Sequence, residues 1–254
     1  MTSRNRGCSV VLLCAAASLL STCTGADPVE HQIGALDDPA RRAQAIDTLV
    51  GYVRRAPKPA RAQLQQRVVY ALTEAYRDDH HRSQIVSALA LLSDPRATEV
   101  FLAAVEDAHR RGPYYDAAVR AARALGELRA QQALPSLIQV VRQAPGRRGS
   151  RTTTALELAA IDALGRLDDR RAVPALLELL RAHDLPSPLQ LKRAAVAALS
   201  LLRAKPALDP LVDLATDDPL ARALLPSIRL ALCRLGPAAA RRLGAVAAEG
   251  NHPG

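Results

Sequence analysis

Aromatic residues are almost absent from this 254-residue chain: they make up 2% of it, with no tryptophan and a single phenylalanine. Because strands favour aromatic and β-branched side chains, this scarcity argues against an all-β core. The chain is nevertheless 49% apolar, mostly through alanine and leucine, which favour closely packed helices. We therefore expect an all-α protein.

Familiar catalytic motifs are also absent. The sequence contains no glycine-rich phosphate loop, nucleophile elbow or zinc-protease histidine pair. The cluster Asp78-Asp79-His80-His81 offers metal-binding side chains, but neighbouring histidines in an extended loop point in different directions and no distant ligand completes a tetrahedron. We therefore predict a protein with no catalytic residues, no metal and no cofactor.

One spacing recurs along the chain every 33 to 40 residues. A leucine is followed eight positions later by an alanine, and four positions after that comes an apolar residue on the same helical face. The leucine and alanine pairs are Leu89 and Ala97, Leu125 and Ala133, Leu164 and Ala172, and Leu199 and Ala207, with a weaker pair at Leu232 and Ala240. Such a period predicts stacked helical hairpins that bury their apolar faces against one another.

The periodicity predicts helices over residues 40–54, 60–77, 82–92, 96–109, 116–128, 131–143, 155–167, 171–182, 189–203, 206–215, 219–234 and 237–249. They form about six hairpins, the first irregular because Pro57 replaces the alanine. Helix starts are predicted at Asp94-Pro95, Asp209-Pro210 and Asp218-Pro219, where an acceptor side chain precedes a residue without an amide hydrogen.

Residues 163–180 read ALGRLDDRRAVPALLELL, and residues 124–138 repeat most of this pattern. The segment resembles a HEAT repeat of the kind also found in phycobilin-lyase-like proteins. The resemblance covers roughly residues 40–249 and implies an α-solenoid, a HEAT-like superhelix. Its functional implication is broad, because such repeats serve scaffolds, adaptors, a few enzymes and DNA-repair glycosylases.

The first 22 residues have the design of a secretory signal, with Arg4 and Arg6 before an apolar run over residues 8–20. Residues 20–23 read LSTC and resemble a bacterial lipobox, which implies lipidation of Cys23, although Thr22 departs from the usual small residue. Cleavage after Ala26 is the alternative and would release a soluble protein. We expect a short linker over 23–39, the repeat domain over 40–249 and a tail over 250–254.

Length varies only in the predicted loops near residues 78–82, 109–115, 145–154, 183–188 and 216–218, which project from one edge of the solenoid. Two of these loops carry a cluster suited to an acidic or phosphate-bearing partner. Its residues are Arg110, Arg111, Tyr114, Tyr115, Arg147, Arg148 and Arg151. The alternative is that these arginines only keep an apolar solenoid soluble.

These features predict a non-catalytic scaffold that binds a protein partner at the bacterial cell envelope and is held to the membrane by a lipid on Cys23. By resemblance to Gram-negative lipoproteins, Thr24 would direct it to the outer membrane. The alternative function is a bilin-lyase-like or chaperone-like protein acting on a bound chromophore or partner. Nucleic-acid binding is disfavoured, because a secretion signal is present and helix faces mix charges, as with Arg120, Arg123 and Glu127.

Overall fold

The structure is a computed structural model that describes residues 27–78, 81–111, 115–145, 151–183, 185, 187–216, 220–236 and 241. For residues 109–111 and 151–153 it describes the backbone alone. Throughout the described part the secondary structure is helical. The α-helices are α2 (Pro28–Gly34), α3 (Pro39–Arg55), α4 (Lys58–Ala75), α5 (Arg82–Leu92), α6 (Thr98–Arg111), α7 (Tyr115–Glu127), α8 (Leu134–Arg142), α9 (Arg151–Leu167), α10 (Val173–Arg181), α11 (Pro188–Leu201), α12 (Leu208–Thr216) and α13 (Ala221–Leu235).

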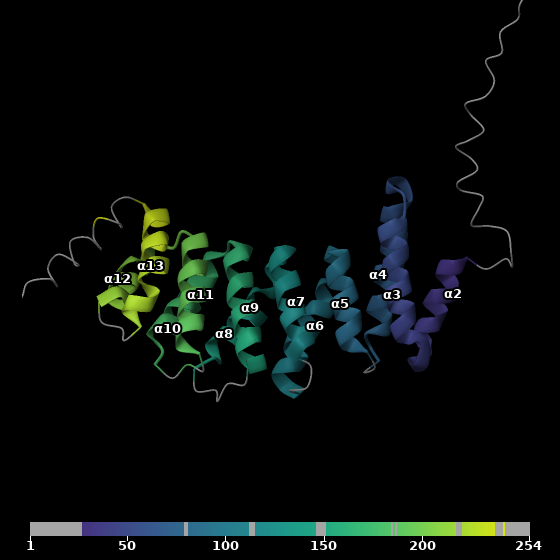
Figure 1. The fold of residues 1–254 in the computed structure, drawn as a ribbon, viewed down its shortest axis with the longest axis horizontal. Helices are drawn as coiled ribbons and strands as arrows, with labels where there is room; N and C mark the ends of the chain where they lie inside the picture. Colours follow the sequence, from purple (N-terminus) through teal and green to yellow (C-terminus); the bar gives the residue numbers. More distant parts are fainter. Residues whose placement is uncertain are drawn as a thin grey trace, which may run out of the picture.

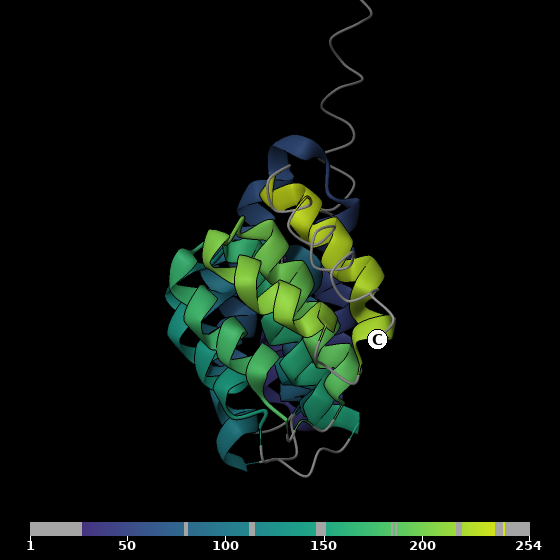
Figure 2. The ribbon, with the colours of Figure 1, turned by 90° about the vertical axis from the view of Figure 1, so that its left-hand side faces the viewer.

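Consecutive helices form antiparallel hairpins that stack side by side (Figure 1). The first helices of the hairpins, α3, α5, α7, α9, α11 and α13, pack against one another in one layer, and the second helices form the other layer. Viewed along the stack, each hairpin lies behind the next (Figure 2). The predicted all-α solenoid is therefore confirmed. No described helix has the length and apolar character needed to span a bilayer.

The predicted helices coincide with the observed ones to within a few residues wherever the structure describes them. Pro135 and Pro174 lie in the first turns of α8 and α10, as helix starters rather than breakers. Asp94 caps its turn by accepting from the amide of Arg96 at 3.0 Å. In contrast, α12 begins at Leu208, so Asp209 lies inside the first turn instead of capping it. Asp218-Pro219 and the helix predicted over 237–249 lie outside the described residues.

The predicted linker over residues 23–39 is corrected by the structure, because it contains α2 and the short 3₁₀ helix η1 (Ala35–Asp37). The side chain of Asp27 accepts a hydrogen bond from the amide of Val29 at 3.0 Å and thereby caps α2. Arg67 in α4 contacts both Asp27, at 2.8 Å, and Glu30. These contacts hold α2 against the repeats.

The constant eight-residue offset corresponds to one backbone conformation. Four positions after each leucine the chain enters the left-handed region, with φ of 49° at Ser93, 50° at Arg129, 55° at Asp168 and 47° at Arg203. The next residue is extended, and a 3₁₀ turn then ends at the alanine. These turns are η2 (Pro95–Ala97), η3 (Gln131–Ala133), η4 (Arg170–Ala172) and η5 (Lys205–Ala207).

Hydrogen bonds close the links after α7 and α11 in the pattern of a Schellman motif. After α7, the amide of Ala130 donates to the carbonyl of Leu125 at 3.0 Å and that of Arg129 donates to Gly126 at 3.2 Å. The leucine and alanine that frame each of the four links are fully buried. The link therefore has a fixed length because its backbone bonds and both of its buried ends would be lost by an insertion.

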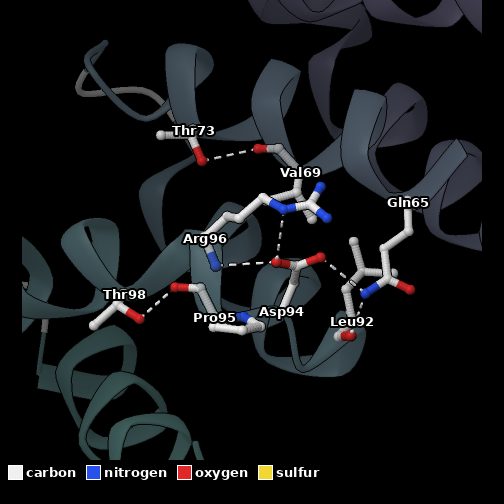
Figure 3. A network of polar contacts seen from close by, with 8 residues as sticks. All are labelled: Gln65, Val69, Thr73, Leu92, Asp94, Pro95, Arg96 and Thr98. Carbon is white, nitrogen blue, oxygen red and sulfur yellow. Dashed lines mark hydrogen bonds and ion pairs between the residues drawn. The ribbon is translucent and has the colours of Figure 1, made fainter. Parts of the chain in front are cut away.

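The link between α5 and α6 is also bound to the preceding hairpin (Figure 3). Asp94 is buried and accepts a hydrogen bond from the side-chain amide of Gln65, in α4, at 3.1 Å. The same amide lies 3.1 Å from the carbonyl oxygen of Leu92 and donates to it. Asp94 thus joins the irregular first hairpin to the first regular link.

Candidate functional site

Most of the predicted loop cluster cannot be placed as a site. Tyr115 is half-buried and packs against the core. Arg110 and Arg111 are in the last turn of α6 and Arg151 is the first residue of α9, but their side chains are outside the description. Tyr114, Arg147, Arg148 and the predicted lipidation site Cys23 lie outside the described residues. The clustering of these side chains therefore stays a prediction.

A groove of about 670 Å³ lies at the opposite edge, where α7, α9 and α11 end in their links. We call it the link groove. Charged side chains dominate its lining: Arg129, Arg166, Arg170, Arg203, Glu127 and Asp168. The sequence did not predict this groove, because the constant links were expected only to connect helices.

The link groove is built from equivalent positions of three successive repeats. Two residues after the repeat leucines lie Glu127, Arg166 and Leu201. Directly after the leucines of the first two of these repeats lie Gly126 and Gly165. A Cβ on Gly126 would lie 2.7 Å from the Cα of Ala163, and one on Gly165 would lie 3.1 Å from that of Ala198. A side chain at Gly126 would force the helices apart and one at Gly165 would be tightly packed, so both glycines allow a close approach of neighbouring helices along the groove.

The groove carries excess positive charge, with four arginines against two acids. Arg166 is paired with Asp162 on the same helix, with 2.8 Å between Nε and Oδ2. Among the residues that the structure describes, Arg129, Arg170 and Arg203 make no ion pair and no side-chain hydrogen bond. Three exposed guanidinium groups therefore have their donors open to an anionic ligand.

The left-handed backbone conformation of Arg129 and Arg203 is a second indication that these two residues bind a ligand. This conformation at the end of a helix is ordinarily taken by glycine, and a side chain there costs roughly 1 kcal/mol. Cations interact favourably with the carboxyl end of a helix, which explains why these two residues are positively charged. It does not explain why the charge lies at a residue with a strained backbone conformation. Helix termination alone would be served better by glycine.

Within the described part of the chain, no three side chains of His, Cys, Asp or Glu are grouped as metal ligands. Asp79 and His80 of the cluster considered in the sequence lie outside that part.

Comparison with known families supports the repeat assignment. A model of HEAT repeats matches residues 150–226, and a model of the PBS lyase HEAT-like repeat matches residues 117–143. The chain carries HEAT-like repeats. The predicted resemblance is thereby confirmed, and all the lining residues of the link groove lie within the two matched ranges.

One similar protein is the "Bilin biosynthesis protein PecE" of Mastigocladus laminosus. It is 36% identical over 91 residues, which make up 36% of this chain and 31% of that protein. The matched part thus spans about a third of the relative's length.

The prediction of a chain without enzymatic activity is contradicted by these comparisons, because one matching model describes a repeat of PBS lyases and the similar protein PecE is a bilin biosynthesis protein. The prediction rested on the absence of compact motifs. A solenoid assembles its functional surface differently, from equivalent positions in successive repeats. Arg129 and Arg203 are 74 residues apart in sequence, so no local motif contains both.

Proposed function

We propose that the chain is a bilin-lyase-like repeat protein, which binds a bilin chromophore in the link groove and acts on it together with a protein partner. The similarity to the PBS lyase repeat and to PecE supports this class. The observation that carries the proposal is the position of three arginines without ion pairs, at the helix ends of the matched repeats.

The chemistry of the groove suits such a ligand. A bilin is a linear tetrapyrrole with two propionate groups, and the planar guanidinium of arginine matches a carboxylate through two parallel hydrogen bonds. Leu201, which is 47% exposed, offers an apolar contact to a pyrrole ring at the same place. The volume of about 670 Å³ lies in the usual range for small-molecule sites.

Titration with biliverdin, as the probe bilin, tests this proposal. We expect a saturable absorbance change and induced circular dichroism with the wild-type protein, and at least about tenfold weaker binding after Arg129→Ala with Arg203→Ala. Arg222→Ala with Arg229→Ala, on the exposed face of α13, is the matched control and should bind normally. Equal affinity in all three proteins would refute the groove as the site.

The location of the protein is a separate part of the proposal. We propose that it resides in the bacterial envelope, anchored by a lipid on Cys23, and the signal-like residues 1–22 support this. The mass of the N-terminal peptide from a bacterial host tests it: a diacylglyceryl-modified Cys23 is expected. A chain that begins at Asp27 would refute the anchor and indicate a soluble secreted protein.

The loop cluster is retained as the proposed contact for an acidic protein partner. Its support is that Arg110 and Arg111 end α6 and Arg151 begins α9 at the same edge of the solenoid, with Arg147 and Arg148 in the segment before α9. Replacement of Arg147 and Arg148 by glutamate should abolish capture of an acidic partner from envelope extracts, while biliverdin binding stays unchanged. Undiminished capture would contradict this assignment.

A further inference from the structure

The tip of the α3–α4 hairpin is a second strongly basic surface, apart from the link groove. No acidic residue occurs between Asp47 and Glu74, a span that contains five arginines and lysines. Four of them surround the turn and are exposed; we call this group the basic tip. It consists of Arg54, Arg55, Lys58 and Arg61. Figures 1 and 2 show this hairpin projecting beyond the edge formed by the other helices.

Helix stability does not account for all of this charge. Arg54 and Arg55 lie at the carboxyl end of α3, where cations are favourable. Arg61 orders the turn by donating to the carbonyl of Ala56 at 3.0 and 3.2 Å and to that of Arg54 at 3.2 Å. Lys58, however, is the first residue of α4, where a cation opposes the helix dipole and no acid compensates it.

The contact between α2 and α4 relates the basic tip to the chain that precedes the repeats. Arg67 holds Asp27 at 2.8 Å and follows Lys58 by nine residues, about 13 Å along the axis of α4. The N-terminal end of α2 points toward the same edge as the tip (Figure 1). Asp27 follows Cys23 by four positions, and four Cα-to-Cα steps reach at most about 14 Å. A lipid on Cys23 can therefore enter a membrane whose surface lies at the level of the tip.

We propose that the basic tip binds the anionic headgroups of a membrane beside the lipid on Cys23, so this inference rests on the proposed lipidation. Each arginine or lysine near an anionic surface contributes about 1 kcal/mol, or about fivefold in binding. Since α3 runs in the same direction as α5, α7, α9 and α11, the tip and the link groove share one edge. Binding of the basic tip to the membrane would therefore orient the edge that carries the link groove toward the membrane surface.

Vesicle sedimentation of the full chain carrying Cys23→Ser, which cannot be lipidated, isolates the contribution of the tip. The probes are vesicles of phosphatidylcholine alone and with about one third phosphatidylglycerol, at low salt. We expect the anionic vesicles to bind at least about tenfold better, and 0.5 M salt to remove the difference by screening. Equal binding to both vesicles would overturn the proposal.

Matched charge reversals then locate the contact. Arg54→Glu, Arg55→Glu and Lys58→Glu together should abolish the preference for anionic vesicles. Arg222→Glu, Arg229→Glu and Arg234→Glu, on the exposed surface of α13, change the net charge equally and should leave most of it. A milder variant, Lys58→Gln, should lower binding about fivefold and guards against misfolding of the triple variant, which circular dichroism also checks. Equal losses in the two triple variants would overturn the tip as the contact.

This outcome is separable from that of the lipid anchor. An unmodified Cys23 with tip-dependent vesicle binding would refute the anchor and support the tip. If Cys23 is lipidated but the preference for anionic vesicles does not depend on the charges of the basic tip, the anchor is supported and the tip is refuted.

Discussion

The regular repeats from α7 to α12 and the irregular hairpin α3–α4 use the same helical architecture differently. In the regular repeats, Gly126 and Gly165 bring consecutive first helices so close that an added Cβ would meet the backbone of the next helix. In α3, Gly51 has no atom within 4 Å of the corresponding position. The two regions differ in how tightly each helix is bound to its neighbour.

This difference corresponds to the two functions that we propose. Close contact through glycine sets the shape of the link groove, which opens where three helices end in the same strained link. The α3–α4 hairpin lacks that link, since Pro57 replaces its alanine, and its turn carries cations on a projecting tip. In our account the regular part binds a ligand and the irregular part contacts a surface.

The largest effect on stability is expected from alanine substitutions at Gly126 and Gly51, which should act in opposite directions. Gly126→Ala should destabilise the protein by about 1–3 kcal/mol, because its Cβ would overlap the Cα of Ala163. Gly51→Ala has the space and should stabilise α3 by about 0.5–1 kcal/mol. Urea unfolding followed by circular dichroism measures both, and changes of the same sign would contradict the account.

A second comparison concerns equivalent link residues in two repeats. Asp94 caps its turn and also accepts from Gln65, whereas Asp169 accepts only within its own link, from Arg171. Asp94→Ala should lower the free energy of unfolding by about 2 kcal/mol, and Asp169→Ala should lower it by about 1 kcal/mol. The fold accepts alanine here in principle, since Ala130 and Ala204 occupy the same position. Equal losses in the two variants would exclude a stabilising role for Gln65.

The strain in the links predicts a gain in stability. Ser93→Gly and Arg129→Gly should each raise the free energy of unfolding by about 1 kcal/mol, because glycine adopts positive φ without a steric penalty. Thermal unfolding of the two variants provides the measurement. A loss of stability at either position would mean that the side chain makes contacts that outweigh the strain.

The smallest effect concerns the attachment of α2 to the irregular hairpin. Hydrogen bonds from Arg67 and from the amide of Val29 hold the pKa of the Asp27 carboxyl below its ordinary value of 3.8. Its contribution to stability is therefore present above 3.8 and is lost as the pH falls through the lower, folded-state pKa. An NMR pH titration of the Val29 amide should give a midpoint below 3.8, and Arg67→Ala should move it upward. An unchanged midpoint in that variant would contradict the contact.

Much of the fold could be predicted from the sequence, because the leucine and alanine spacing reports directly on which side chains are buried. The helices that begin within residues 23–39 also have a sequence signal, because Asp27-Pro28 and Asp38-Pro39 repeat the start pattern of Asp94-Pro95. The left-handed conformation within each link was not predictable, since serine, arginine and aspartate occupy it instead of glycine.

The link groove was harder to predict than the helices. Its signals were present as Gly126 and Gly165 after the repeat leucines, and as Arg129 and Arg203 at one register position. Sequence alone does not give the distance between neighbouring helices, so it could not show that these residues line a common space. The charge pattern of the variable loops predicted instead a cluster that lies largely outside the described residues.

The central claim is that Arg129 and Arg203 are kept in strained positions to bind a ligand, and Arg129→Gly with Arg203→Gly tests it most directly. We predict that this double variant unfolds at a higher urea concentration than the wild type and binds biliverdin at least about tenfold more weakly. Greater stability with unchanged affinity would contradict the claim, because the two arginines would then contribute nothing to the bound state.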